Sequence, residues 1–363
     1  MAMFPPSLPH VFIRWLTQPG DVVYDPFSGR GTTALEACLE GRKGFGSDLN
    51  PLALVLSGAK VAPPSPEEAV ERLKELARHR QFWDPRSEPD RIRMLFDDAT
   101  LGELLWLKQS LDVTNRVDRF LVAALLGILH ANADASGAPR GLTVSMPNTF
   151  SMSPGYVAKY IAEHGLVPPK VSPLTKLRTR VGDILRRPYR HHGAAWQRDA
   201  TGALAGPIRR APAKLLFTSP PYLHVIKYGK LNWIRLWLLG ASPRDVDDAL
   251  FSSSSLERYA RFVRKMLEAN VDAVRDDGWL CLVIGDVRRR GENLNLAQVV
   301  ADSCIAGTGL TVRRIINDRL PVHHKVSRIW KDTKGRATKT DRVLMLARRR
   351  APRLAALPAV AWN

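Results

Sequence analysis

The sequence contains little cysteine, no long apolar run and few acidic residues for its number of basic ones. Its three cysteines, Cys38, Cys281 and Cys304, stand at unrelated spacings, which excludes a disulfide framework and a cysteine metal cluster and fits a reducing cytoplasm. The longest apolar run, residues 121–129, is too short to span a bilayer. The first residues lack the basic and apolar regions of a signal peptide, so we expect a cytoplasmic protein without a membrane partner.

The shortage of acidic residues leaves a large positive charge. The chain has 54 Lys+Arg against 35 Asp+Glu, a formal net charge of +19 over 363 residues. Such a surplus predicts a polyanionic partner, because each cation placed on a phosphate releases condensed counterions. The basic residues are spread along the chain, so we expect a nucleic-acid-binding surface on a folded protein rather than a disordered basic arm.

The first fifty residues alternate between strand and helix patterns. Residues 21–25 read as a buried strand, residues 32–39 have helical spacing, and residues 43–48 form a second strand. This order predicts an α/β fold with a mostly parallel sheet. Later strand patterns occur at residues 214–217 and 279–284 and, as an expected antiparallel hairpin at the carboxyl end, at residues 312–316 and 343–347.

Residues 66–195 have a different character. Helical stretches alternate with polar loops that contain proline and glycine, and these stretches are residues 67–80, 101–111 and 119–131. We therefore predict a largely helical insertion at 66–195. The α/β domain would comprise residues 1–65 and 196–350, with residues 351–363 as a carboxyl-terminal tail.

Residues 25–33, D-P-F-S-G-R-G-T-T, form a glycine turn between a strand and a helix. Gly29 and Gly31 let the backbone approach a ligand closely, and the start of the helix offers free N–H groups. Asp48 ends the next strand, where a carboxylate can accept both hydroxyls of a ribose. Together with Ala34 the glycines also satisfy a dinucleotide fingerprint, so a nicotinamide-dependent oxidoreductase is an alternative.

The composition of the turn favours a cationic ligand over a pyrophosphate. Asp25 places a carboxylate, and Phe27 a bulky ring, on the approach that a pyrophosphate would use. A carboxylate at that point matches the ammonium of an amino acid better.

Residues 218–222, T-S-P-P-Y, follow the apolar run 215–217, where a buried strand would end. The two prolines remove two backbone donors and fix two φ angles, which makes a stiff corner. That corner presents the hydroxyl of Ser219, free carbonyls and the ring of Tyr222. These groups suit a flat substrate that carries an amino group, such as an extruded nucleobase.

The glycine turn, the segment G-S-D-L-N-P and the segment T-S-P-P-Y together resemble the amino-group DNA methyltransferases, which use S-adenosylmethionine to methylate N4 of cytosine or N6 of adenine. The resemblance implies a Rossmann-like class I methyltransferase fold, S-adenosylmethionine as the cofactor and double-stranded DNA as the partner. It also implies a bacterial or archaeal cytoplasmic location at the nucleoid. The glycine turn precedes the T-S-P-P-Y segment, whereas many of these enzymes have the opposite order.

Carried over position by position, the resemblance implies roles for individual residues. The cofactor would be bound by Phe4, Asp25, Phe27, Gly29, Gly31, Thr32, Asp48, Asp199 and Thr218. Among these, the residues of the glycine turn line the methionine portion, and Asp48 binds the ribose hydroxyls. Asp199, which lies shortly before the T-S-P-P-Y segment, contacts the adenine.

The expected catalytic residues are Ser219, Pro220, Pro221 and Tyr222. The lone pair of a base's amino group is delocalised into the ring, so catalysis needs acceptors that hold the amino hydrogens. Ser219 Oγ and the Pro220 carbonyl are the expected acceptors, and Tyr222 stacks on the flipped base; no metal is required. C5 methylation would need a cysteine nucleophile, typically after a proline, and no cysteine here follows one. In the family that the chain resembles, serine at the position of Ser219 goes mostly with cytosine N4 and aspartate mostly with adenine N6, so the resemblance implies cytosine N4.

The expected DNA contacts are Asn148, Lys227, Tyr228, Lys230, His324 and Lys325. The run 222–233 mixes basic and aromatic residues, a usual composition for nucleic-acid contacts, while Trp233 and Trp237 are expected in the core. The insertion is expected to supply sequence recognition, with residues 148–153 and 178–190 as its main candidates.

Four alternatives remain at this point. Adenine-N6 methylation, RNA methylation and a noncatalytic nucleic-acid-binding module share the same features, and the oxidoreductase shares the glycine turn. The oxidoreductase explains neither the T-S-P-P-Y segment nor the net charge of +19. The resemblance is compatible with a homodimer and with a cognate restriction endonuclease, in restriction-modification or in an orphan epigenetic role.

Overall fold

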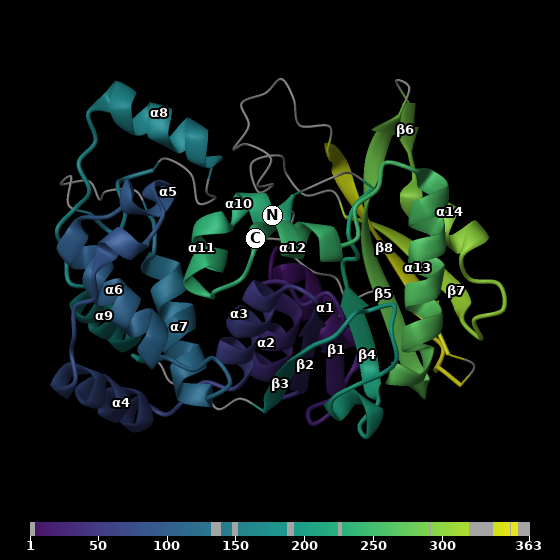
Figure 1. Ribbon diagram of the computed structural model, residues 1–363. Coiled ribbons are helices and arrows are strands. Elements are labelled where there is room, and N and C mark those ends of the chain that lie inside the picture. Colours follow the sequence, from purple (N-terminus) through teal and green to yellow (C-terminus); the bar gives the residue numbers. More distant parts are fainter. Residues whose placement is uncertain are drawn as a thin grey trace. The chain divides into compact units, whose positions relative to one another are not determined.

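The computed structural model describes residues 4–131, 139–146, 152–186, 192–223, 227–289, 292–318, 337–348 and 350–354. The chain divides into two compact units (Figure 1). The first unit comprises Met1–Ser57, His191–Ile226 and Leu250–Asn363, and the second comprises Gly58–Arg190 and Lys227–Ala249.

The described part of the first unit is built on an eight-stranded sheet. Its strands are β1 (Val22–Asp25), β2 (Lys43–Asp48), β3 (Gly193–Gln197), β4 (Ala213–Thr218), β5 (Val274–Arg289), β6 (Glu292–Leu294), β7 (Thr311–Asp318) and β8 (Ala337–Ala347). Their order is β3-β2-β1-β4-β5-β8-β7, with β6 paired to β5 (Figure 1). The strands from β3 to β5 run parallel, and β8 runs antiparallel to both β5 and β7. The predicted parallel sheet and carboxyl-terminal antiparallel hairpin are therefore confirmed.

Helices cover both faces of this sheet. They are α1 (Ser7–Leu16), α2 (Thr32–Leu39), α13 (Leu256–Asn270) and α14 (Leu296–Ser303), with the short turns η2 (Pro207–Arg209) and η3 (Val271–Ala273). Successive strand residues point to opposite faces, so Val23 packs with α1 and α2 while its neighbours Val22 and Tyr24 pack with α13 and α14. Burial on both faces explains why the central strands β1, β4 and β5 contain continuous apolar runs.

The second unit is helical in its described residues. Its helices are α4 (Pro66–Arg78), η1 (Pro85–Ser87), α5 (Asp90–Arg93), α6 (Asp98–Ser110), α7 (Arg116–Ile128), α8 (Pro154–His164), α9 (Pro173–Leu185), α10 (Tyr228–Leu231), α11 (Trp233–Leu238) and α12 (Pro243–Ala249). Helix α3 (Pro51–Val61) begins in the first unit and ends in the second. The predicted helical insertion is thus present.

Capping side chains set the starts of the predicted helices one to three residues earlier than hydrophobic periodicity alone suggests. Ser65 caps α4 by a reciprocal pair of bonds with Glu68, in which Glu68 N donates to Ser65 Oγ at 3.2 Å and Ser65 N to Glu68 Oε2 at 2.7 Å. Asp97 caps α6 and Asn115 caps α7 in the same position.

Residues 227–249 belong to the second unit, whereas the sequence placed them in the α/β domain. Two tryptophans of α11 explain the difference. Trp233 Nε1 donates to the carbonyl of Met152 at 2.7 Å, and Trp237 Nε1 donates to Glu88 Oε2 at 2.7 Å. Trp233 is buried and Trp237 is half-buried, in agreement with their predicted core positions. The predicted boundary at residue 195 also falls inside β3.

The described part of the basic stretch 178–190 lies on α9, where Leu174, Leu177 and Val181 form a buried face. The basic residues therefore occupy the other side of an amphipathic helix. None of the helices described is both long and apolar enough to cross a membrane.

Candidate active site

The order of the parallel strands reverses between β1 and β4. In an open α/β sheet the crevice at such a switch point, at the carboxyl ends of the strands, is where ligands bind. Asp25 is the last residue of β1 and Thr218 the last residue of β4. The glycine turn and the Ser-Pro-Pro-Tyr loop, far apart in the sequence, therefore begin side by side at this crevice.

A hydrogen bond joins the two strand ends directly. Thr218 Oγ1 donates to Asp25 Oδ1 at 2.5 Å, and the backbone N–H of Phe27 donates to the same oxygen at 3.0 Å. Asp25 is only 2% exposed and Thr218 is fully buried. Burial raises the pKa of Asp25 to about 6, against the opposing effect of the two hydrogen bonds. A cation in the crevice would favour the ionised form of this carboxyl group.

The glycine turn is braced from α3. Gly29 and Gly31 have φ values of +49° and +76°, a left-handed conformation that favours glycine. A Cβ at Gly31 would lie 2.9 Å from both Cα and Oγ of Ser57, whereas one at Gly29 would meet only the carbonyl oxygen of Phe27, at 3.8 Å. Ser57 Oγ also donates to the carbonyl of Gly29 at 3.3 Å. No local sequence pattern points to Ser57, because its contact with the turn joins residues that lie 26 and 28 positions apart.

Thr32, which follows the turn, is the first residue of α2. The first N–H groups of a helix have no partner within the helix, and those of α2 directly follow the glycine turn.

Asp48 ends β2, the strand next to β1. Its Oδ2 accepts from the N–H of Gly29 at 2.9 Å, and its Oδ1 accepts from the N–H of Asn50 at 2.9 Å. Burial raises the pKa of Asp48, and these backbone bonds act in the opposite direction. Each carboxylate oxygen has a second lone pair, so the partly exposed group can still accept hydroxyl hydrogens.

Asp199 lies two residues beyond β3, the strand next to β2. It is exposed, and its Oδ1 accepts both the N–H of Thr201 at 2.8 Å and the Thr201 hydroxyl at 2.9 Å. Asp25, Asp48 and Asp199 therefore follow three neighbouring parallel strands. Neighbouring strands are about 4.8 Å apart, so the three carboxyl groups line one edge of the sheet.

The Ser-Pro-Pro-Tyr loop continues directly from β4. Pro220 is buried, whereas Ser219, Pro221 and Tyr222 are half-buried. Ser219 Oγ and the hydroxyl of Tyr222 are 3.4 Å apart, a weak contact that leaves the serine hydroxyl able to engage another group. This half-buried set of polar and aromatic groups stands beside the glycine turn.

Gly285 of β5 makes room for the ring of Tyr222. A Cβ at Gly285 would lie 2.9 Å from Tyr222 Cε1 and 3.1 Å from Asp341 Oδ1. A glycine within a strand often marks such a close approach. The sequence carried this signal, because Gly285 interrupts the apolar strand pattern, but nothing local connected it with Tyr222.

Two predicted cofactor residues pack on opposite faces of the sheet. The ring of Phe4 meets that of Phe217 edge-on, with centroids 5.5 Å apart, on the α1 face. The ring of Phe27 packs against Phe262 of α13, with centroids 5.9 Å apart. Both rings therefore pack in the core, where the partner of Phe4, Phe217, directly precedes Thr218 and Phe27 itself belongs to the glycine turn.

Three of the six predicted DNA contacts lie within the described residues. Lys227 and Lys230 are exposed, Tyr228 is half-buried, and all three belong to the second unit. The N–H groups of Gly229 and Lys230 donate to Asp247, which fixes the short helix α10. The remaining predicted contacts, Asn148, His324 and Lys325, lie outside the described residues.

The cysteines are buried, and none is in a disulfide. Cys38 lies in α2 and Cys281 in β5, as predicted, and Cys304 follows α14. Burial raises the pKa of all three thiols, which opposes formation of the thiolate needed for covalent chemistry.

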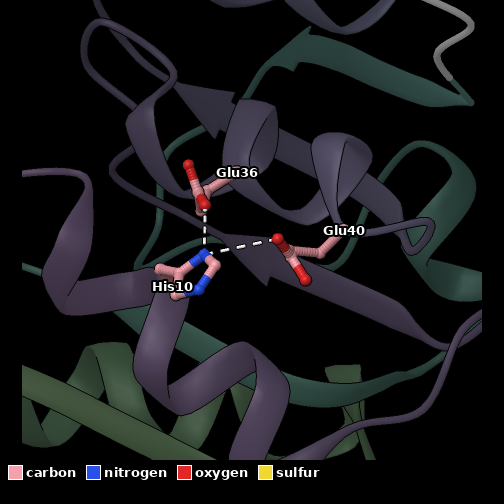
Figure 2. Close-up of side chains that lie close together, drawn as sticks. All are labelled: His10, Glu36 and Glu40. Carbon is pink, nitrogen blue, oxygen red and sulfur yellow. Dashed lines mark hydrogen bonds and ion pairs between the residues drawn. The ribbon is translucent and has the colours of Figure 1, made fainter. Parts of the chain in front are cut away.

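One group of described residues has the composition of a metal site. His10 of α1 lies between Glu36 and Glu40 at the end of α2, with the potential ligand atoms within 4.8 Å of one another (Figure 2). His10 Nδ1 is 2.6 Å from Glu36 Oε1 and 3.4 Å from Glu40 Oε1, and Arg14 Nε is 3.8 Å from Glu40 Oε2. These contacts join α1 to α2, and they explain the proximity of the three side chains without a metal ion.

The strand order, the antiparallel hairpin at one edge and the crevice between β1 and β4 define the class. The fold is the Rossmann-like class I methyltransferase fold.

Comparison with known proteins finds similarity to one family. Residues 1–56 match the family model N6_N4_Mtase, described as DNA methylase. Type II methyltransferase M.MvaI of Kocuria varians is 35% identical over 78 residues, which are 21% of this chain and 17% of the relative. M.BglI of Bacillus subtilis is 32% identical over 99 residues (27% and 28%), and M.PvuII of Proteus hauseri is 48% identical over 50 residues (14% and 15%). Residues 1–56 are thus similar to the N4/N6 DNA methylases. The chain spans less than a third of the length of the three relatives.

Solved structures with a similar course of the chain include TrmN from Thermus thermophilus, with 10% identity and a TM-score of 0.37 over 95% of this chain and 49% of that one. The rRNA methyltransferase AviRa from Streptomyces viridochromogenes has 12% identity and a TM-score of 0.34 over 95% and 86%.

The family and the fold imply S-adenosylmethionine as the cofactor. The residues at the crevice fit such a ligand. Asp25 supplies negative charge for a cation, Asp48 has free lone pairs for hydroxyl groups, and the backbone at Gly29 leaves room for close approach.

Proposed function

We propose that this chain is an S-adenosylmethionine-dependent DNA methyltransferase that modifies an exocyclic amino group. The observation that carries the proposal is the 2.5 Å hydrogen bond from Thr218 to Asp25 at the switch point of the sheet. It ties the strand that leads into the glycine turn to the strand that leads into the Ser-Pro-Pro-Tyr loop. Groups suited to a methyl donor and groups suited to an amino acceptor thereby share one crevice.

In this proposal the cofactor is held along the carboxyl edge of three neighbouring strands. The glycine turn and Thr32 bind its methionine portion, with the charge of Asp25 attracting the ammonium. Asp48 accepts the ribose hydroxyls, and Asp199 accepts the adenine amino group. Phe4 and Thr218 support the crevice from the core side. When bound, S-adenosylmethionine supplies an electrophilic methyl group on a sulfonium sulfur.

The Ser-Pro-Pro-Tyr loop would hold the amino group of a flipped base. Ser219 Oγ and the Pro220 carbonyl accept the two amino hydrogens, which favours a pyramidal nitrogen with its lone pair free to react. Pro221 keeps the corner stiff, and Tyr222 stacks on the base. A methyl group supplied by the bound cofactor would replace one of the two amino hydrogens, and that hydrogen, held by Ser219 Oγ or the Pro220 carbonyl, would leave to solvent as a proton. Close alignment in the crevice supplies much of the rate.

We propose cytosine N4 as the acceptor, because position 219 carries a serine hydroxyl rather than a carboxylate. Covalent attack on cytosine C5 is disfavoured, since the pKa of each of the three cysteine thiols is raised by burial. Adenine N6 is the alternative that the family leaves open. The nicotinamide-dependent oxidoreductase is disfavoured by the match of the glycine turn to DNA methylases.

We further propose that the second unit binds and reads double-stranded DNA. The net charge of +19 supports a nucleic-acid partner, and Lys227 and Lys230 place exposed cations in that unit. Tyr228 would contact DNA beside them. Asn148 in the sequence of the same unit, and His324 and Lys325 in the sequence of the first unit, are further proposed contacts. A cytoplasmic site of action at the nucleoid, a homodimer and a cognate restriction endonuclease complete this proposal.

The test is to incubate the protein with S-adenosylmethionine and unmethylated bacterial DNA and to identify modified nucleosides by mass spectrometry. RNA is run in parallel, and Ser219→Ala serves as the matched control for contaminating activity. N4-methylcytosine in DNA supports the proposal, and N6-methyladenine changes the base but not the reaction. Product on RNA alone, or no product with either polymer, would refute it.

A further inference from the structure

The loop that follows β3 is held by two buried side chains. Arg198 is 5% exposed, and its Nε donates to the carbonyl of Ala203 at 3.0 Å while its Nη2 donates to that of Gly202 at 2.7 Å. Asn270 is fully buried at the end of α13, and its Nδ2 donates to the carbonyl of Ala200 at 2.7 Å. Three carbonyls of the loop 199–203 are therefore bonded to buried side chains.

The two side chains also bind each other and the sheet. Arg198 Nη1 donates to Asn270 Oδ1 at 2.7 Å and to the hydroxyl of Tyr24 at 3.0 Å, and Nη2 reaches the carbonyl of Ala269 at 3.2 Å. The hydrogen-bond partners found for this guanidinium in the described structure are all uncharged. Burying a guanidinium without a carboxylate partner costs free energy. The five hydrogen bonds to neutral acceptors offset this cost and hold the loop after β3 in one conformation.

The far end of the loop is fixed by packing. Gly206 has φ of +73°, and a Cβ there would lie 2.7 Å from Cε2 of Trp196. The Trp196 ring in turn stacks on Tyr24, with centroids 5.6 Å apart and an angle of 4° between the ring planes. A surface loop is ordinarily mobile, and this one is anchored at both ends.

The anchored loop begins with Asp199, whose carboxylate is itself oriented. Both of its bonds within the described structure end on Oδ1, from the N–H and the hydroxyl of Thr201. Oδ2 is therefore the oxygen that can accept from a ligand. A small rotation of the loop would move this oxygen, and a preorganised acceptor loses less entropy when it binds.

We propose that Arg198 and Asn270 are positioning residues that set the protein's preference for adenine in its nucleoside ligand. They act through the loop of residues 199–203, which aims Asp199 Oδ2 at the exocyclic amino group. The inference rests on the proposed use of S-adenosylmethionine and on the proposed role of Asp199. It adds a pair of buried residues that neither touch the ligand nor belong to a recognisable motif.

The experiment compares two ligands that differ in that amino group. Dissociation constants of S-adenosylhomocysteine and S-inosylhomocysteine are measured by calorimetry for the wild-type protein and its variants. Hypoxanthine presents an oxygen where adenine presents an amino group, so the ratio of the two constants reports the contact with Asp199. A lost hydrogen bond to a charged group corresponds to about a tenfold preference or more, which is the ratio expected for the wild-type protein.

Two variants disturb different anchors of the loop. Arg198→Lys has three donors for the five acceptors that Arg198 bonds, and Asn270→Asp keeps the acceptor for Arg198 but loses the donor to Ala200. We expect each to lower the adenine preference at least about fivefold, toward the value of Asp199→Asn. Tyr24→Phe is the matched control, because it removes a bond to Arg198 without touching the loop and should leave the ratio unchanged.

The outcomes separate this inference from the proposed function. The inference is supported if both variants lose the adenine preference, measured as the ratio of the two dissociation constants, while their unfolding midpoints are no lower than that of Tyr24→Phe. A wild-type ratio in either folded variant overturns it while leaving the proposed function intact. If the wild-type protein binds neither ligand, the proposed cofactor and this inference both fail.

Discussion

Replacing Asp25 with asparagine should stabilise the protein at neutral pH while impairing its function. Burial raises the pKa of this carboxyl group from 3.8 to about 6, so the folded protein binds the proton more tightly than the unfolded chain does. The stability contributed by this preference is present below pH 4 and is lost as the pH rises through about 6. The change corresponds to about 3 kcal/mol, and the ionised group therefore weakens the fold by up to this amount at pH 7.5.

Asparagine can keep the hydrogen bonds that aspartate makes. Thr218 Oγ1 and the N–H of Phe27 both donate to Oδ1, which the amide oxygen can replace without movement. The amide nitrogen then stands where the second carboxylate oxygen was, which offsets part of the gain. We expect Asp25→Asn to be more stable than the wild-type protein by about 1–3 kcal/mol at pH 7.5 and equal to it near pH 4.

The assay is urea unfolding at a series of pH values from 4 to 8, with binding of S-adenosylmethionine measured in parallel. Loss of the negative charge should weaken binding about tenfold or more at pH 7.5, and wild-type binding should weaken toward that of the variant below pH 6. This prediction would be refuted if the variant were less stable than the wild-type protein at pH 7.5, or if the two still differed in stability near pH 4. Either result would show that the ionised Asp25 does not destabilise the folded protein.

Three further substitutions test other parts of the site. Ser219→Ala should lower turnover about 100-fold or more and leave cofactor affinity within about twofold, as measured by methyl incorporation and calorimetry; unchanged turnover would remove this hydroxyl from the mechanism. Gly285→Ala places a Cβ 2.9 Å from Tyr222, so turnover should fall about tenfold with little loss of cofactor binding; wild-type turnover would mean that the ring position is unimportant. Gly31→Ala should lower the free energy of unfolding, measured with urea, by about 2–4 kcal/mol. Gly20→Ala is the control and should cost less, because Gly20 shares the positive φ but a Cβ there meets nothing within 4 Å. Equal losses in the two variants would show that Ser57 of α3 moves aside at little cost.

The sequence allowed the sheet and its ligand edge to be predicted because their signals are local. Strands such as β1 and β4 are short apolar runs that end in polar residues, and each is followed by a turn of distinctive composition. By contrast, β3 is Gly-Ala-Ala-Trp-Gln, which has little intrinsic strand preference. It becomes a strand by pairing with β2, which no local pattern records.

The errors in the domain boundaries have a similar cause. Residues 227–249 follow shortly after the Ser-Pro-Pro-Tyr loop, so their sequence position favoured the α/β domain. The indole N–H groups of Trp233 and Trp237 instead bond to Met152 and Glu88, which lie at least eighty positions earlier in the chain. Periodicity identified these tryptophans as core residues but could not identify the core to which they belong.

The positions of Ser57, Gly285 and Arg198 in the site were beyond sequence reasoning for a third reason. Each acts on a functional segment through a contact that depends on the assembled sheet. Ser57 closes on Gly31 from α3, and Gly285 lies under Tyr222 from β5. An arginine directly before Asp199 reads as an ordinary surface cation until the fold buries it.

The features that weaken the fold gather along the edge where the ligand is proposed to bind. Asp25 carries a charge in a buried position, Gly31 is left-handed against Ser57, and Arg198 is buried among neutral acceptors. They belong to the ends of β1 and β3 and to the turn that follows β1, all at the carboxyl edge of the sheet. Departures from the usual folding rules persist chiefly where function requires them. Their concentration at one edge therefore favours a ligand site there independently of the motifs, and it explains why relieving the charge of Asp25 should raise stability at the expense of activity.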